Sequence, residues 1–374
     1  MASKLFAWLA LLLTLPACAS TTFHERELWN QAAKEEETLD KAGQPYGDPL
    51  LEEYLARVAA RVAPAQMIAS APPIRVSVVG DPTLNAFAMP DGRVYLHTGL
   101  LARLENEAQL AAILAHELTH VTHRAALGLD ARVPESVSAA PAVFRGLPLA
   151  SRAAVRGYGR ALERDADVQG LRRMVEAGYD PGQAPRAFEL LQRRYGDSGA
   201  LEPFFFGNRS QLEERARNAR ELLQARYAGL DPRSLNRNGN EFAARTRVLV
   251  RENAALDVRA GRFELARAQL DHVLALMPTD AAAYVVYGDL HRLQAQRPGR
   301  AADAGRLRTL ARQAYERAAG LDPTYADPFR QLGLLYYESG DRADAQVAFR
   351  KYLALDPDAV DARRIHEYVV ELAR

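Results

Sequence analysis

Cysteine is almost absent from this sequence, which has 374 residues and a single cysteine, Cys18. A lone cysteine cannot close an internal disulfide, so the fold has no disulfide framework. Net charge is almost absent too, because 48 basic and 47 acidic residues leave +1. No nucleic-acid partner is expected, since binding phosphates needs a basic surface. Long apolar runs are also missing, because the run at 5–15 is shorter than the about 20 residues that span a bilayer.

The N-terminus has the pattern of a secretory signal, in which Lys4 precedes the short apolar run. The run ends at Leu15-Pro16-Ala17-Cys18, which is similar to a bacterial lipobox. We predict a signal peptide over residues 1–17 and lipidation of Cys18, which would anchor the chain to a membrane. Ala19, where Asp would retain the protein at the inner membrane, implies the outer membrane and a periplasmic location. The alternative is an ordinary cleaved signal with an incidental cysteine.

The rest of the chain divides into three parts, which its length permits. Residues 18–47 are polar and predict a tether with one helix. Residues 48–235 predict a mostly helical domain of the α+β class with a small β-sheet, because β-branched and alternating residues at 74–79, 86–89 and 93–97 precede a series of amphipathic helices. The helices are expected at 48–62, from Asn106 onward, and at 151–177, 185–194 and 211–227.

Residues 242–374 predict an all-α superhelix of three tetratricopeptide repeats. Pro323 and Pro357 are 34 residues apart, which is the period of that repeat. Pro278 precedes Pro323 by 45 residues, so the middle copy carries an insertion of about 11 residues, expected near 296–305. A capping helix should follow at 359–373.

The segment His116-Glu117-Leu118-Thr119-His120 is the candidate for chemistry. Residues four apart lie on one face of a helix, so the two histidines can bind one metal ion. Zinc at a catalytic site takes three protein ligands and leaves a position for water, and Glu117 can accept the proton of that water. The alternative is a pair of surface histidines. His97, at the end of a predicted strand, has no companion in the sequence.

A third ligand must come from another segment, and Glu163-Arg164-Asp165-Ala166-Asp167 offers carboxylates. Glu163 and Asp167 share a helical face, whereas Asp165 points elsewhere. Glu163 as ligand, with Asp167 bonded to the free N–H of a liganding histidine, would satisfy both the metal and its surroundings. The alternative for Glu163 is a surface salt bridge with Arg160 or Arg164.

The motifs Asn85-Ala86-Phe87, Gly99-Leu100-Leu101, the run 106–117 and Glu163-x-x-Ala166-Asp167 resemble those of gluzincin peptidases of the HtpX, Oma and CAAX-prenyl-protease type. The BepA-like periplasmic branch, which ends in tetratricopeptide repeats, is the most similar. The resemblance covers residues 45–230 and implies one Zn²⁺ per chain, held by His116, His120 and Glu163, with Asp167 behind. It also implies that an edge strand near 85–89 pairs with extended substrate.

Two positions depart from the family. Gly159-Arg160 stands where Ser-Arg is usual before the liganding Glu, and Arg209-Ser210 stands where relatives carry His-Pro. The resemblance implies that this histidine plugs the zinc site, so that form of self-inhibition is not expected here. Arg209 cannot bind zinc, but it can pair with a substrate carboxylate or an oxyanion.

The sequence therefore predicts a periplasmic zinc endopeptidase that cleaves unfolded or misassembled outer-membrane proteins, with Glu117 as its catalytic base. The repeats would bind stalled substrates or the outer-membrane assembly machinery. The alternative from another class is a non-proteolytic chaperone or adaptor with a latent metal site. Glu117 favours the enzyme, because zinc ligation alone does not need it. A repeat scaffold with an incidental histidine pair is a third option, and it leaves the match at 163–167 unexplained.

Overall fold

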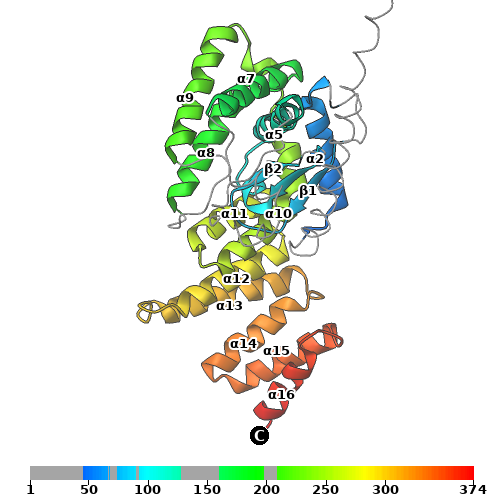
Figure 1. The fold of residues 1–374 in the computed structure, drawn as a ribbon. Helices are drawn as coiled ribbons and strands as arrows, with labels where there is room; N and C mark the ends of the chain where they lie inside the picture. Colours follow the sequence, from blue (N-terminus) through cyan, green and yellow to red (C-terminus); the bar gives the residue numbers. More distant parts are fainter. Residues whose placement is uncertain (1–44, 66, 68–73, 90–91, 128–159, 198–208) are drawn as a thin grey trace, which may run out of the picture.

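The computed structural model describes residues 45–65, 67, 74–89, 92–127, 160–197 and 209–374. The signal peptide, Cys18 and the tether up to residue 44 lie outside the described residues, as does the first part of the helix predicted at 151–177. Figure 1 shows a mixed part that contains the sheet and, below it, a column of helices that runs to the C-terminus. None of the described helices combines the length and the apolar composition that a membrane span needs.

The first described helix, α2 (Pro49–Val62), confirms the expected one. The carboxylate of Asp48 accepts a hydrogen bond from the backbone N–H of Leu51 at 3.0 Å and so caps the helix. Its apolar face is buried, with Tyr54 and Leu55 both at most 2% exposed. This face packs on the sheet and on the helix that carries the two candidate histidines.

The sheet has three strands, β1 (Val76–Val79), β2 (Ala86–Ala88) and β3 (Val94–His97), in the order β1-β3-β2. Strands β1 and β3 are parallel, while β2 and β3 form the predicted antiparallel hairpin. The strand expected at 74–79 starts at Val76. Strand β2 lies at one edge, as the family resemblance implied for the segment 85–89.

Helix α5 (Glu107–Leu127) carries the candidate motif and follows the short helix α4 (Thr98–Leu101). Asn106 caps α5 as predicted, because its side-chain oxygen accepts the N–H of Gln109 at 3.0 Å. Asn106 and Gln109 have the spacing of a capping box, in which the side chain of Gln109 would also accept the N–H of Asn106, but that bond is absent among the described residues. The side chain of Gln109 accepts the N–H of Glu105 instead, at 2.8 Å.

Three further helices complete this part: α7 (Arg160–Glu176), α8 (Gln183–Asp197) and α9 (Arg209–Arg226). Helix α7 packs directly against α5 (Figure 1). Gly170 permits this approach, because a Cβ there would lie 3.3 Å from the backbone nitrogen of His116. Arg173 of α7 donates to the hydroxyl of Thr119 at 2.6 Å and so fixes the relative position of the two helices.

The C-terminal part consists of helical hairpins, α10–α11, α12–α13 and α14–α15, followed by α16. Two hairpins share one packing position, where a glycine of the first helix accommodates an aromatic ring of the second. A Cβ at Gly288 would lie 2.2 Å from Tyr315, and one at Gly333 would lie 2.4 Å from Phe349. The elements are α10 (Gly239–Arg259), α11 (Phe263–Leu276), α12 (Ala281–Ala295), α13 (Ala304–Leu321), α14 (Asp327–Ser339), α15 (Arg342–Leu355) and α16 (Ala362–Leu372).

The middle hairpin is longer than the others in its loop and in its second helix. Residues 296–303 separate its helices, whereas 260–262 and 340–341 suffice in the other two hairpins. Helix α13 has 18 residues, against 14 each in α11 and α15. The extra residues therefore fall where the proline spacing predicted them. Stacked hairpins of this kind agree with tetratricopeptide repeats, an assignment that remains a prediction.

The segment between the two parts is bonded to the mixed part. Asn236 pairs with Tyr179 in an isolated β-bridge, and Arg237 lies 2.7 Å from the carboxylate of Asp180. Asn238, with a left-handed φ of 49°, donates from Nδ2 to Oε1 of Glu107 at 2.8 Å. The end of this segment is thus tied to the first residue of the helix that carries the candidate site.

Candidate metal centre

Helix α5 brings His116 and His120 together one turn apart. Their Nε2 atoms are 3.0 Å apart, and the residues are 2% and 1% exposed. This burial excludes the alternative of two surface histidines. Buried polar groups need partners, and two imidazole nitrogens that converge inside a protein are typical of a metal site, where the ion is their shared partner.

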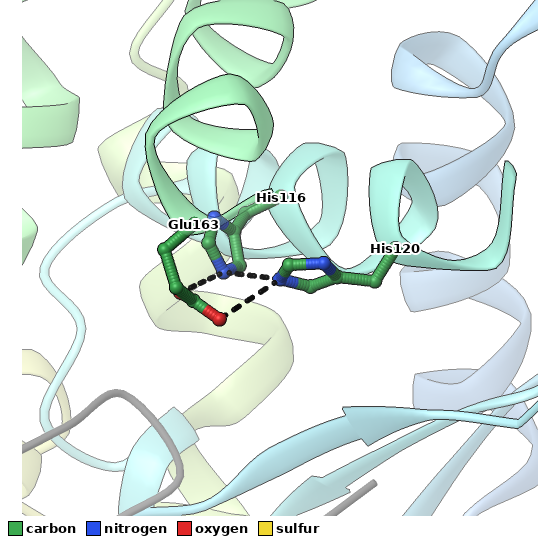
Figure 2. A group of neighbouring side chains, drawn as sticks. All are labelled: His116, His120 and Glu163. Carbon is green, nitrogen blue, oxygen red and sulfur yellow. Dashed lines mark hydrogen bonds and ion pairs between the residues drawn. The ribbon is translucent and has the colours of Figure 1, made fainter. Parts of the chain in front are cut away.

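Glu163, on α7, completes the cluster (Figure 2). Its Oε2 lies 3.4 Å from Nε2 of His116, and its Oε1 lies 3.5 Å from Nε2 of His120. One ligand atom from each of the three residues lies within 4.8 Å of the other two. Ligands at 2.0–2.1 Å around a tetrahedral zinc ion are about 3.3 Å apart. The spacing and the chemistry of these donors therefore fit zinc.

The neighbouring charges of α7 point elsewhere. Arg164 pairs with Glu214 at 3.2 Å, so it does not form the surface salt bridge considered for Glu163. Asp165 accepts from the side chain of Gln169 at 3.4 Å. The side chain of Arg160 lies outside the described residues. Of the carboxylates at 163, 165 and 167, only the first and third face the histidines, as the helical spacing predicted.

Asp167 lies behind the cluster, 3.0 Å from Nδ1 of His116. A carboxylate in this position holds the imidazole in the orientation that leaves Nε2 for a metal. The side chain of Asp167 is 14% exposed and that of His116 is 3% exposed, so little water competes for this contact. The structure thus brings Asp167 to the place that the spacing and the resemblance implied.

Arg215, on α9, is the residue of this site that the sequence did not indicate. Its Nη2 and Nε donate to the two carboxylate oxygens of Asp167 at 2.6 Å and 3.0 Å. Its Nη2 also lies 3.0 Å from Nδ1 of His116, and its guanidinium stacks on the ring of Phe188 with 4.3 Å to the centroid. Nothing in the sequence marks it, because α9 is rich in arginine.

Charge is tightly coupled in this group. Burial and the nearby Arg215 act to lower the pKa of His116, but hydrogen bonds to Asp167 and Glu163 outweigh them and raise it to about 9. Burial acts to raise the pKa of Asp167, and Arg215 and His116 together hold it below its usual value. In the metal-free protein His116 therefore carries a proton at neutral pH, which a metal ion would displace.

Glu117 is adjacent to the first histidine on α5 and is fully buried. Burial acts to lower the pKa of the Arg215 guanidinium, but Asp167 and Glu163, with the charge of Glu117, outweigh it and raise that pKa. A carboxylate beside a metal-binding cluster in a buried site has the position of a proton acceptor for a metal-activated water.

Two other sequence candidates lie elsewhere. Arg209 begins α9, and its side chain lies outside the described residues. His97 has companions that the sequence did not reveal, because its Nδ1 lies 2.7 Å from the hydroxyl of Thr83 and 3.7 Å from Oδ1 of Asp81. This buried group joins the end of β3 to the loop after β1.

Residues 49–225 match the family model described as Peptidase family M48. The matched range contains the sheet, α5 and the helices that carry Glu163 and Arg215. Together with the cluster of donors, the match supports a metalloendopeptidase.

Particular relatives point in the same direction. A Vibrio cholerae protein that is named as a beta-barrel assembly-enhancing protease is 28% identical to this chain over 274 residues, which is 67% of this chain and 54% of that protein. The beta-barrel assembly-enhancing protease of Escherichia coli is 30% identical over 40% of this chain and 34% of its own length. The mitochondrial metalloendopeptidase OMA1 of Arabidopsis thaliana is 32% identical over 33% of this chain and 27% of its own. This chain thus spans about half or less of each relative.

Proposed function

We propose that this chain is a zinc metalloendopeptidase that cleaves unfolded or misassembled outer-membrane proteins in the periplasm. The observation that carries the proposal is the convergence of His116, His120 and Glu163 in a buried site beside Glu117. Relatives named as proteases of β-barrel assembly support the substrate class. Lipidation of Cys18, an outer-membrane location and tetratricopeptide repeats that recruit substrate or assembly machinery belong to the same proposal.

In this proposal each residue has a defined task. His116, His120 and Glu163 would hold one zinc ion, which would supply a positive charge to acidify water and polarise a peptide carbonyl. Glu117 takes the proton from that water and delivers it to the leaving amine. Asp167 and Arg215 keep the imidazole of His116 in place. Strand β2, at the edge of the sheet, pairs with substrate in an extended conformation.

A non-proteolytic adaptor with a latent metal site is the competing function. The groove in the C-terminal hairpins described below favours a binding role for that part, and such a role serves both an enzyme and an adaptor. Glu117 separates the two, because an adaptor has no use for a buried carboxylate beside its metal ligands.

The test compares the chain from Ala19 onward with its Glu117→Gln variant. We expect about one zinc per chain in both proteins, and a loss of cleavage of an unfolded protein by a factor of about 10² to 10⁴ in the variant. Zinc is measured by mass spectrometry of the purified protein and cleavage by the release of fragments.

Two further variants test the ligand set on the same helix. Glu163→Ala should lose zinc, whereas Asp165→Ala, which removes a carboxylate from the other face, should keep it. Full zinc without cleavage of any unfolded protein would favour the adaptor. A wild-type protein without zinc would overturn both metal hypotheses.

A further inference from the structure

A groove runs along the C-terminal part and is lined by the first helix of each hairpin. Helices α10, α12 and α14 contribute most of its wall, and the segment between α15 and α16 closes one end. Its volume is about 800 Å³, which is enough for several side chains of an extended peptide. The proposed chemistry of the metal site makes no use of this groove.

The lining of the groove is strongly acidic. Six carboxylates and two guanidinium groups face it, which gives a formal charge of 2 − 6 = −4 in a protein whose total is +1. The lining acids come from four different elements of the fold rather than from one run of sequence. They are Glu252, Asp289, Asp327, Asp356, Asp358 and Asp361.

The two arginines of the lining are already paired. Arg251 lies 3.1 Å from both carboxylate oxygens of Asp280, whose side chain is only 3% exposed and does not line the groove. Arg330 lies 2.5 Å from the carboxylate of Asp361. Their charges are therefore largely compensated, and neither guanidinium is placed to attract an acidic ligand.

Three of the six lining acids have an arginine partner, because Glu252 pairs with Arg251, Asp289 with Arg292 and Asp361 with Arg330. The other three keep their charge for a ligand. Within the described part of the chain, no cation lies within salt-bridge distance of Asp327, Asp356 or Asp358, and all three are exposed. Asp289 lies deeper, where its carboxylate accepts the Tyr315 hydroxyl at 2.8 Å and lies 3.6 Å from the guanidinium of Arg292, while its side chain remains 27% exposed. Close to it, Oε1 of Gln331 is buried and has no hydrogen-bond partner among the described residues.

Apolar groups alternate with these acids. Tyr325, Tyr352 and Val286 line the groove, as does Val360, whose side chain is fully exposed. Lysine and arginine side chains match this combination, because their aliphatic stems pack on apolar and aromatic surface while their charged ends reach carboxylates.

We propose that this groove binds an extended, lysine- or arginine-containing segment of another polypeptide. The inference rests on the proposed function in which the C-terminal part recruits substrate, and it specifies the chemistry of what is recruited. The carboxylates of Asp327, Asp356 and Asp358, which have no ion-pair partner among the described residues, attract the cationic side chains. An acidic segment is excluded, because it would place like charges against the acids that have no ion-pair partner.

The test uses the full chain from Ala19 with Glu117→Gln, so that binding is separated from cleavage. Two labelled peptides of about ten residues are compared by fluorescence anisotropy, one alternating Lys and Ser and one alternating Glu and Ser. We expect the lysine peptide to bind and its Kd to rise steeply between about 50 mM and about 300 mM NaCl, while the glutamate peptide does not bind.

A matched pair of double variants locates the binding. Asp356→Asn with Asp358→Asn removes two exposed charges from the groove and should raise the Kd of the lysine peptide by about fivefold or more. Glu264→Gln with Asp344→Asn removes the same charge from the outer helices α11 and α15 and should change it by less than about twofold. Asp327→Asn should also weaken binding, and circular dichroism checks that this variant is folded.

The outcomes separate this inference from the proposed function. No binding of the lysine peptide, equal binding of both peptides, or equal weakening by the two double variants would overturn the groove proposal. If that happens while wild-type protein still cleaves unfolded protein in a Glu117-dependent way, the peptidase stands and only the groove proposal falls. If the lysine peptide binds to a protein that has neither bound zinc nor cleavage activity, the groove proposal stands and the peptidase proposal falls.

Discussion

Arg215 sets the balance of charge around the metal-binding cluster. Its guanidinium neutralises Asp167 through two hydrogen bonds, at 2.6 Å and 3.0 Å, and lies 3.9 Å from Oε2 of Glu163. Without it, two largely buried carboxylates, 21% and 14% exposed, would face each other across a single histidine. Removing one partner of a buried ion pair costs about 3–5 kcal/mol, because the other charge is left uncompensated.

We therefore expect Arg215→Met to weaken zinc binding by about 10- to 100-fold and to reduce cleavage accordingly. Competition with a chromophoric chelator measures the affinity. The matched control is Arg217→Met on the same helix, where the side chain is exposed and faces away from the cluster. Equal zinc affinity in the two variants would show that Arg215 does not hold His116 and Asp167 in place.

At the scale of residues, the sequence predicts partners that follow from helical periodicity and misses those that follow from packing. His116 and His120 are four apart on one helix, as are Glu163 and Asp167, so each pair shares a face by geometry alone. Arg215 comes from a helix whose polar residues look alike in the sequence. Only the docking of α9 against α7 distinguishes it from Arg217 or Arg220.

Among the elements, the short helix α4 depends on one close approach. Gly99 packs so tightly on the loop after β1 that a Cβ there would lie 2.1 Å from the carbonyl oxygen of Pro82. The same contact is held by Thr98 and by the Gly99 N–H, which both donate to the carbonyl of Asp81 at 2.9 Å. A methyl group at this position would force the loop and the helix apart.

Gly99→Ala should therefore lower the free energy of unfolding by about 1–3 kcal/mol, through overpacking and loss of these hydrogen bonds. Urea denaturation followed by circular dichroism gives the value. Gly320→Ala is the control, because nothing lies within 4 Å of a Cβ there and alanine favours the interior of α13. A Gly99→Ala protein as stable as the control would mean that the loop adjusts without cost.

Elements were predictable where a local signal marks them. Asn106 caps its helix at the position where the sequence placed the helix start, and β2 and β3 pair antiparallel where two successive extended segments were expected. The capping box failed because Gln109 bonds to Glu105 instead of the cap residue. That choice depends on the backbone conformation before the helix, which propensity alone does not determine.

For the whole molecule, Glu107 is the point where several parts meet. Its carboxylate accepts the hydroxyls of Tyr54 at 2.7 Å and Tyr179 at 2.6 Å, together with the amide of Asn238. Burial and the hydrogen bond to Glu107 raise the pKa of both tyrosines, so their hydroxyl groups stay protonated at neutral pH and remain donors. One buried side chain thus joins α2, the segment after α7 and the start of the hairpin array.

Glu107→Ala should lower the unfolding free energy by about 3–5 kcal/mol, because three buried or half-buried donors lose their acceptor. Since the two parts of the chain share this group, calorimetry should show one transition for the wild type and separate transitions for the variant. Glu105→Ala, two residues away and exposed, is the control and should leave a single transition. A single, unshifted transition in Glu107→Ala would show that the parts are coupled by other contacts.

The junction at 236–238 also shows where the sequence misleads at this scale. Its two asparagines, together with the Gly and Pro residues on either side, predict a linker, yet its side chains bond to Asp180 and Glu107. Linker composition and a tightly bound connection look the same in sequence, because both need residues that tolerate turns and left-handed φ values.

This junction has a consequence for how such proteins can be recombined. A boundary placed by composition would assign residues 236–238 to the hairpins, although these residues form hydrogen bonds with the mixed part. If hairpin arrays are exchanged between relatives, residues 236–238 must come from the same protein as α5. Otherwise Glu107 loses the partner that Asn238 provides. The natural crossover point is therefore inside the first turn of α10, after Gly239.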